Sequence, residues 1–257
     1  MPPTLSDLEK WARAAGDILR SGYGQQIYIE HKGVIDLVTE MDRRSEAYLL
    51  ASIQDRFPDH RIISEEAGEI AGSNGQIWYV DPLDGTVNYA HGVPIFSVSI
   101  AYAEQGQVKL GVVYDPMQDE CYAAERGAGA YLNGQRLQVS AAPDLAHSLL
   151  VTGFPYDTWS NPNNNLDNYA RFSLRSQGVR RLGSAAIDLA YVAAGRLDGF
   201  WEISIQAYDI AAGALLVEEA GGIVTDIRGG PDYLKSPQSI IAANPQVHPQ
   251  MVTLLQK

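Results

Sequence analysis

Two aspartates three positions apart stand between an apolar run and a glycine. Asp81 and Asp84 follow the apolar residues 78–80, and Gly85 comes next. Two carboxylates held in a turn at this spacing can converge on one hard cation, while neighbouring backbone N–H groups stay free to bind an anion. The same residues also suit an ordinary strand that ends in a tight turn, with Asp and Gly in their usual turn positions.

Two more acidic residues stand where apolar segments end or helices begin. Glu65 follows the apolar residues 61–64, and Asp209 precedes a helical pattern. Each has an ordinary alternative, because Glu65 and Glu66 can be a solvated charge pair and Asp209 can be a helix N-cap. If these carboxylates were gathered without a cation, two of them about 4 Å apart would repel by about 4 kcal/mol at an effective dielectric constant of about 20. Such a cluster would therefore need a metal ion.

The available donor types select the metal. Carboxylate oxygens favour magnesium over zinc, and the five histidines lack the paired spacing of a zinc site. Cys121 is the only cysteine, which excludes an intramolecular disulfide and a cysteine-rich zinc site. The sequence therefore predicts Mg²⁺ as the cofactor.

The composition limits the class of protein and its partners. A chain of 257 residues, 46% hydrophobic and 19% charged, can bury a substantial core. The net charge of -12, from 19 basic and 31 acidic residues, argues against nucleic-acid binding through a basic face. The start of the chain has no signal-peptide pattern, and no window reaches the roughly 18 apolar residues that span a bilayer. We therefore expect a cytoplasmic protein without membrane contact.

The elements that position these acids follow from hydrophobic periodicity. In residues 1–143 two helices precede an antiparallel meander, which predicts an α+β half, and in residues 144–257 strands and helices alternate as in an α/β half. No linker separates the halves, so we expect one unit in which they are tightly joined. Helices are expected at 6–22, 40–57, 165–176, 184–194, 209–220 and 247–255, a loop at 68–75, and strands at 61–66, 95–102, 108–114, 121–124, 129–132, 136–139, 149–152, 179–182, 199–203, 223–227 and 240–243.

Three blocks of the sequence together resemble the inositol monophosphatase family of magnesium-dependent, lithium-sensitive phosphatases. The first is Asp36 to Asp42, the second joins 63–66 to 78–89, and the third runs from Glu202 to Gly222. The match covers essentially the whole chain, and it implies a single catalytic unit, 1–257, with the layered α-β-α-β-α sandwich found in this family and in fructose-1,6-bisphosphatase. Small departures occur where the family more commonly has Thr, Phe and Trp, at Val87, Tyr89 and Tyr208.

The resemblance assigns roles to the acidic residues and to the turn that follows them. It implies two or three Mg²⁺ ions in the active site, one held by Glu65, Asp81 and the carbonyl of Leu83, and a second held by Asp81, Asp84 and Asp209. Two metals of this kind stabilise the attacking and leaving oxygens of an in-line displacement. The resemblance further implies that the N–H groups of Gly85 and Thr86 bind phosphate, and that Thr86, Asp42 and Glu65 orient and activate the metal-bound water.

The resemblance also indicates which residues contact the alcohol part of the substrate. It implies contacts with sugar or inositol hydroxyls from Asp84, Gly183, Ser184, Ala185 and Glu202. A carboxylate such as that of Glu202 can accept hydrogen bonds from two adjacent hydroxyls, which suits a polyol. Lys32 is either part of a mobile loop over the metals or a plain surface lysine.

These expectations lead to a phosphoric monoester hydrolase that acts on a small sugar-type phosphate, with myo-inositol 1-phosphate as the first substrate to try. The same architecture serves enzymes acting on fructose 1,6-bisphosphate, histidinol phosphate, NADP and 3′-phosphoadenosine nucleotides, and the metals do not choose among them. An alternative of another class is a non-catalytic partner in a bacterial transcription complex, which a basic patch would favour, but only Arg175, Arg180 and Arg181 form a modest cluster. A homodimer is expected from the family.

Overall fold

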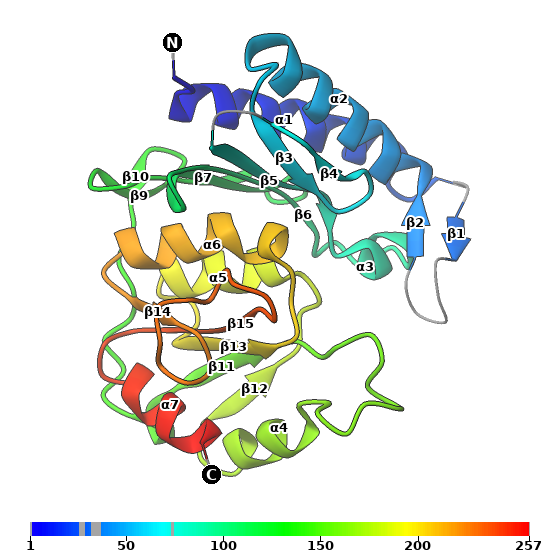
Figure 1. Cartoon of the computed structure of the whole chain (residues 1–257). Helices are drawn as coiled ribbons and strands as arrows, with labels where there is room; N and C mark the ends of the chain where they lie inside the picture. The colour runs from blue at the N-terminus through cyan, green and yellow to red at the C-terminus, as the bar shows by residue number, and fades with distance from the viewer. Residues whose placement is uncertain (1, 26–28, 32–36, 73–74, 257) are drawn as a thin grey trace.

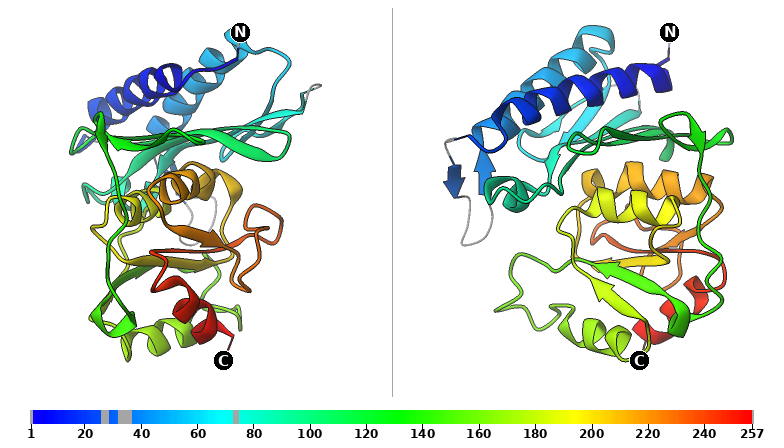
Figure 2. Two further views of the ribbon diagram at one scale, coloured as in Figure 1. Left: turned by 90° about the vertical axis from the view of Figure 1, so that its left-hand side faces the viewer. Right: turned by 180° about the vertical axis from the view of Figure 1, so that it is seen from behind.

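The fold has five layers, seen edge-on in Figure 1. The computed structural model describes residues 2–25, 29–31, 37–72 and 75–256. An outer helix pair covers an eight-stranded sheet, a central helix pair separates that sheet from a five-stranded one, and two further helices cover the far side of the second sheet. Figure 2 shows the same order of layers from the side and from behind. The expected α-β-α-β-α sandwich is confirmed.

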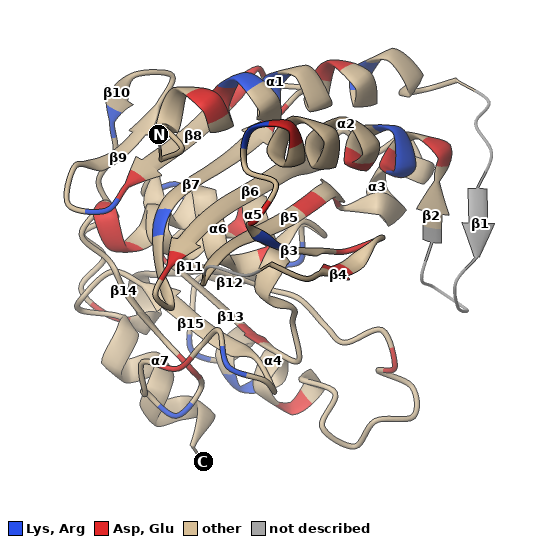
Figure 3. Ribbon diagram, turned by 45° about the horizontal axis from the view of Figure 1, so that its top comes forward, with Lys and Arg blue, Asp and Glu red and all other residues tan. Residues whose placement is uncertain are grey.

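The first layer consists of two long helices whose starts are fixed by capping boxes. In α1 (Leu5–Gly22) the Thr4 side chain accepts from the N–H of Asp7, whose carboxylate accepts from Thr4 in return. Thr39 and Asp42 form the same reciprocal pair at the start of α2 (Glu40–Arg56). Such caps satisfy N–H groups that the first helical turn leaves without partners. Charges of both signs lie along these two helices (Figure 3).

The eight-stranded sheet carries the first group of predicted site residues. Its strand order is β10-β9-β8-β7-β6-β5-β3-β4, and every neighbouring pair is antiparallel except β3 and β5, which are parallel. Because β3 and β5 run in the same direction, their carboxyl ends meet at one edge, and the acidic residues that follow them come together there. The strands are β3 (Arg61–Ser64), β4 (Gly68–Ile70), β5 (Gln76–Asp84), β6 (Ser97–Glu104), β7 (Gln107–Asp115), β8 (Glu120–Glu125), β9 (Gly129–Leu132) and β10 (Gln135–Arg136).

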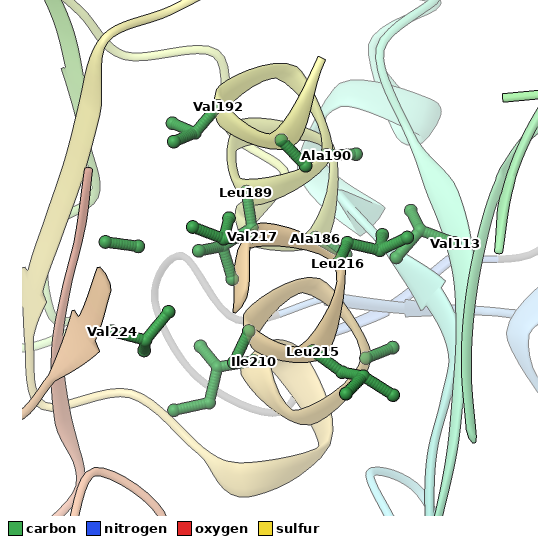
Figure 4. Close-up of a cluster of buried hydrophobic side chains, with 14 of the residues drawn as sticks. Val113, Ala186, Leu189, Ala190, Val192, Ile210, Leu215, Leu216, Val217 and Val224 are labelled. Atoms are coloured by element: carbon green, nitrogen blue, oxygen red, sulfur yellow. The ribbon is translucent and has the colours of Figure 1, made fainter. Parts of the chain in front are cut away.

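The central layer is formed by α5 (Ala185–Ala193) and α6 (Ala207–Glu219), which are apolar on nearly all sides because sheets lie on both faces. Figure 4 shows Leu189 and Ile210 of these helices together with Val113 of β7. Small residues allow close approach, since a Cβ at Gly111 of β7 would lie 3.0 Å from the backbone of α6. The two sheets and the central helices therefore share one hydrophobic core.

The second sheet has the strand order β12-β11-β13-β15-β14. Strands β12, β11 and β13 run parallel, and β15 pairs antiparallel with both of its neighbours, β13 and β14. A separate apolar cluster, which includes Phe172 and Trp201, joins this sheet to the outer helices. The remaining elements are β1 (Ile29–His31), β2 (Leu37–Thr39), α3 (Thr86–Ala90), a 3-10 turn (Leu145–His147), β11 (Leu149–Thr152), α4 (Leu166–Ser173), β12 (Gly178–Arg180), β13 (Gly199–Ile203), β14 (Ile223–Thr225), β15 (Ser239–Ala243) and α7 (His248–Leu255).

The predicted elements are largely confirmed, with two corrections. Residues 68–75 were expected to be a loop, but Gly68–Ile70 pairs with β3 as β4, because backbone pairing at a sheet edge needs no hydrophobic pattern. The strand expected at 136–139 is wrong beyond Arg136, after which the chain leaves the sheet toward the second half. The division near residue 143 falls between β10 and the 3-10 turn, and the description of two joined halves stays a prediction.

No helix within the described parts of the chain is both long and apolar enough to cross a membrane.

Candidate active site

A cleft of about 480 Å³ opens where the carboxyl ends of β3 and β5 meet the starts of α5 and α6. All the predicted site residues except Asp42 line it, namely Glu65, Asp81, Leu83, Asp84, Gly85, Thr86, Gly183, Ser184, Ala185, Glu202 and Asp209. Asp42 is fully buried and reaches the site through Thr86. Residues far apart in the sequence are thus brought to one place.

An irregularity in β5 shapes the acidic turn. β5 pairs regularly with β6 up to Asp81, and pairing resumes at Asp84 with one extra residue on the β5 side. Pro82 cannot donate a ladder hydrogen bond, so a bulge at this point costs no lost donor. The N–H of Leu83 donates to Asp81 Oδ1 at 3.0 Å, which holds the first carboxylate against the turn.

Asp84 connects the eight-stranded sheet to helix α5 of the central layer. Its Oδ2 accepts from Ser184 Oγ at 2.6 Å and from the N–H of Ala186 at 2.7 Å, both at the start of α5. These bonds oppose the effect of burial, which nevertheless raises the Asp84 pKa to about 6. Asp84 is therefore fixed by an element more than a hundred residues away in the chain.

Gly85 occupies a backbone conformation that other residues rarely adopt. Its φ is +98°, and a Cβ there would lie 3.0 Å from the carbonyl oxygen of Ile95 and 3.2 Å from that of Gly183. Glycine is required on both counts. The turn then leads directly into α3, whose first residue is Thr86, so the N–H groups after Gly85 are not used by the strand.

Thr86 and Asp42 form a buried hydroxyl–carboxyl pair. Thr86 Oγ1 lies 3.0 Å from Asp42 Oδ1 and 3.0 Å from the carbonyl oxygen of Leu83, so its single proton has two acceptors to choose between. The other oxygen of Asp42 accepts from the N–H and hydroxyl of Thr39. Burial raises the Asp42 pKa to about 6, against the lowering effect of these hydrogen bonds. The hydrogen bond from Thr86 therefore links the cleft to a buried carboxyl whose pKa is raised.

The remaining acids lie close together in the cleft, where Asp81 neighbours both Glu65 and Asp209. Asp81 and Asp209 have pKa values raised well above the ordinary range, chiefly by burial and then by neighbouring carboxylates. Asp209 is the third residue of α6 and accepts from the N–H of Gln206 at 2.8 Å. The alternative that Asp209 is the helix N-cap is wrong, because Gln206 occupies that position. Glu65 adds a further repulsive charge to Asp81.

The cleft acids are of the chemical type that binds a hard divalent cation, but their side chains are not arranged around a single cation position. The acids offer only oxygen donors, and the one lysine or arginine among the residues lining the cleft is Arg181. Over the described residues, no three His, Cys, Asp or Glu side chains are already arranged as a metal site. Several of the oxygens instead point at their own donors, as Asp81 does at Leu83 and Asp209 at Gln206. Cation binding would therefore require side-chain rotation within a cluster already gathered by the backbone.

A further acid of the cleft, Glu202, comes from the five-stranded sheet. Glu202 of β13 is only 8% exposed, and burial raises its pKa to about 8, with Arg181 opposing and Asp84 adding to the shift. Its carboxylate fills the space that a side chain at residue 153 would need, since a Cβ on Gly153 would lie 2.2 Å from Glu202 Oε2. Glu202 therefore presents its carboxyl group to the cleft from a fixed position.

Asp188 is a site residue that sequence reasoning missed. It lies on α5, is 2% exposed, lines the cleft, and its Oδ1 has no hydrogen-bond partner. Burial and the charges of Asp84 and Glu202 raise its pKa well above the ordinary range. The one sequence feature that could have pointed to Asp188 is that it is the only charged residue in the helix 185–193. Sequence reasoning also missed the segment 153–157, which forms one wall of the cleft.

Other predicted residues lie elsewhere. Lys32 and Asp36 lie outside the described residues, so neither can be placed. Arg181 lines the cleft beside the acids, whereas Arg175 donates to the carbonyl of Arg171 at the end of α4. The departures Tyr89 and Tyr208 are accommodated, the first through a hydrogen bond to the carbonyl of Leu19 and the second as part of the cleft lining.

Comparison with known proteins agrees with this arrangement. A model of the inositol monophosphatase family matches residues 3–257. "Nus factor SuhB" of Escherichia coli (strain K12) is 44% identical over 250 residues, covering 96% of this chain and 93% of the relative, and "Inositol-1-monophosphatase" of Mesorhizobium japonicum is 43% identical over 256 residues, covering 98% and 96%. The crystal structure of the extragenic suppressor protein suhB from Bartonella henselae superimposes with a TM-score of 0.92 at 40% identity and covers 98% of both chains. The chain belongs to the inositol monophosphatase family.

Proposed function

We propose that this protein is a magnesium-dependent phosphatase that hydrolyses a small sugar-type phosphate monoester, with myo-inositol 1-phosphate as the leading substrate. The observation that carries the proposal is the cleft itself, in which buried carboxylates lie beside the Thr86–Asp42 pair. A buried acidic cluster of this kind is costly unless something in the cleft balances it. Family membership supports phosphatase chemistry, and the proposal includes the homodimer expected from the family.

The metal ligands of the proposal are the acids at the strand ends. Glu65, Asp81 and the carbonyl of Leu83 would hold one Mg²⁺, and Asp81, Asp84 and Asp209 a second, with room left open for a third ion. When bound, such ions neutralise charge on phosphate oxygens and on the leaving oxygen. The mutual repulsion among Asp81, Asp84 and Asp209 is the electrostatic cost that cation binding would relieve.

The chain's own groups supply phosphate binding and proton transfer. The N–H groups of Gly85 and Thr86 follow the bulged strand and would donate to phosphate oxygens. The attacking water must lose a proton, and Thr86 Oγ1 can accept a hydrogen bond from it while donating to Asp42 Oδ1. The Asp42 carboxyl, with a pKa of about 6, then holds the proton at that oxygen. Glu65 would orient the same water from the opposite side.

The alcohol portion of the substrate is proposed to lie against Asp84, Gly183, Ser184, Ala185 and Glu202. Ser184 Oγ already donates to Asp84, so Glu202 is the stronger candidate to accept from hydroxyls. A carboxyl held at the cleft wall suits two adjacent hydroxyls. This favours a polyol over a flat heterocycle, although the fold alone serves several phosphate esters.

The first prediction tests the reaction class. Purified protein should release phosphate from myo-inositol 1-phosphate with Mg²⁺, lose that activity in EDTA, and be inhibited by lithium. The measurement is a phosphate-release assay over a panel that adds fructose 1,6-bisphosphate, histidinol phosphate, NADP and 3′-phosphoadenosine nucleotides. If phosphate is released only from another ester, the proposed substrate is wrong and the proposed phosphatase reaction is supported. No release from any of them would contradict the proposal.

The second prediction concerns Glu202→Gln. At about pH 9, above the Glu202 pKa of about 8, the substitution removes a charged acceptor for substrate hydroxyls. It should then raise KM for the inositol ester by about tenfold or more, because hydrogen bonds to charged groups are worth about 1.5–3 kcal/mol. Mg²⁺ affinity, measured by titration calorimetry, should stay within about twofold, because Glu202 is not a proposed ligand. Equal losses of substrate and metal affinity would argue against a role in alcohol recognition.

The third prediction concerns stability and pH in metal-free protein. The pKa of Glu202 rises from about 4.3 in the unfolded chain to about 8 in the folded protein. Between these two values the folded protein keeps a proton that the unfolded chain releases. The contribution of Glu202 to stability is complete below about pH 4.3 and is lost as the pH rises toward 8. Glu202→Gln should therefore gain stability over wild type between pH 5 and 8, by about 1–4 kcal/mol. Urea unfolding in EDTA measures this, and a difference independent of pH would contradict it.

A second candidate function rests on the relatives named Nus factor, which are 44% identical to this chain. That name describes those proteins, and it favours a role in a transcription complex alongside or in place of catalysis. The net charge of -12 disfavours direct nucleic-acid binding, so contact with a protein partner is the form this function would take.

The fourth prediction separates the two functions through Asp84→Asn. The substitution removes a proposed metal ligand, so phosphate release should be abolished. If catalysis is the cellular role, a strain in which this variant replaces the wild-type protein should show the deletion phenotype. A normal phenotype in a strain that expresses the inactive variant at the wild-type level would instead favour the non-catalytic role.

A further inference from the structure

Helix α2 turns a polar face toward the cleft elements. Asp42, Ser45 and Glu46 lie three and four positions apart, so they share one face, and their exposed fractions are only 0%, 0% and 8%. Burying polar side chains in a helix that packs on a sheet is unfavourable unless each finds a partner. Asp42 is already accounted for by Thr86, which leaves Ser45 and Glu46 without a role in the proposed reaction.

Glu46 binds the turn that carries Glu65. Its Oε1 accepts three hydrogen bonds, from Ser64 Oγ at 2.6 Å, from the N–H of Glu66 at 3.2 Å and from the N–H of Ala67 at 2.9 Å. These donors lie on both sides of Glu65 in the sequence. A single buried carboxylate oxygen therefore fixes the backbone on which Glu65 sits, and Glu65 N–H adds a bond of 3.2 Å to Val80 in β5.

Ser45 binds the neighbouring turn. Its hydroxyl donates to the carbonyl oxygen of Pro82 at 2.8 Å, inside the bulge between Asp81 and Leu83. The bulge leaves this carbonyl outside the regular ladder with β6, so the serine supplies its partner. The same helical turn thus holds the two segments of the eight-stranded sheet that carry proposed metal ligands.

We propose that Ser45 and Glu46 are positioning residues that hold the metal-binding carboxylates together against their own repulsion. The inference rests on the proposed function, because it concerns the same site. Glu65 and Asp81 repel each other, and a turn that is free to move would carry Glu65 away from the cluster. The three bonds at Glu46 oppose that movement before any cation arrives. The affinity for the cation is then not reduced by the free energy needed to bring its ligands together.

A purely structural role makes a different prediction. If Glu46 only stabilises the fold, its loss lowers the unfolding temperature without changing the affinity of the folded protein for Mg²⁺. If Glu46 positions Glu65, its loss weakens Mg²⁺ binding even at temperatures where the variant is fully folded. The Mg²⁺ dissociation constant is therefore the decisive readout.

The fifth prediction compares Glu46→Ala with Glu46→Gln by calorimetric Mg²⁺ titration of the full-length protein. Glu46→Ala should weaken Mg²⁺ binding by about tenfold to a hundredfold, the range found when supporting residues behind a metal site are removed. Glu46→Gln keeps an acceptor oxygen for the same donors and should stay within about threefold of wild type. Asp55→Asn, an exposed acid on the same helix, is the matched control and should leave binding unchanged.

Two results would overturn the inference. One is a Glu46→Ala protein that melts at a lower temperature but binds Mg²⁺ as wild type does. The other applies if Glu46→Ala does not fold: Ser64→Ala removes one of the three donors, and unchanged Mg²⁺ binding in that variant would count against positioning. If the wild-type protein binds Mg²⁺ but hydrolyses no ester, only the proposed reaction is contradicted. The inference about Glu46 is still tested by the Mg²⁺ titration.

Discussion

The constraint on which the structure depends is the repulsion among carboxylates buried in one cleft. Asp81 and Asp84 lie on β5 and Asp209 on α6, and burial raises the pKa of all three carboxyls. Neighbouring carboxylates raise the pKa further, those of Glu65 and Asp84 at Asp81 and those of Asp84 and Glu202 at Asp209. Left alone, such groups would move apart or stay protonated. The fold keeps them together through hydrogen bonds from backbone N–H groups and through helices that start at the cleft, so a cation would need only side-chain rotation to bind.

The five layers serve that purpose. β3 and β5 run parallel, so their ends deliver Glu65 and Asp81 to one edge, and the central helices bring residues of the second half to the same edge. Asp84 accepts hydrogen bonds at the start of α5, so the cleft is formed jointly by the eight-stranded sheet and the central helices. Helix α2 packs on this edge of the sheet, where Asp42, Ser45 and Glu46 bond to Thr86, Pro82 and Ser64, respectively.

Hydrophobic periodicity is a local signal, so the sequence alone could predict most of the helices and strands, whereas the layer order came from the resemblance to the family. Acids at strand ends are a local signal too, and the oxygen-donor cation site that they indicate stays a prediction. The sequence could not predict the polar face of α2, since Ser45 and Glu46 look like ordinary surface residues until β5 and the turn at 64–67 are packed on them. Asp188 was missed for the same reason, because one acid in an apolar helix has no meaning without its neighbours. Strand β4 was missed because edge pairing depends on the backbone of its partner.

The central claim is that the gathered carboxylates bind divalent cations. Mn²⁺ substitutes for Mg²⁺ at oxygen sites and has an anomalous signal, so crystals of the protein soaked with Mn²⁺ give the most direct test. The account predicts anomalous peaks within about 2.0–2.4 Å of Asp81 oxygens, with Glu65, Asp84 and Asp209 completing the coordination. Well-diffracting crystals with no peak in the cleft, or with peaks only at surface acids, would contradict it.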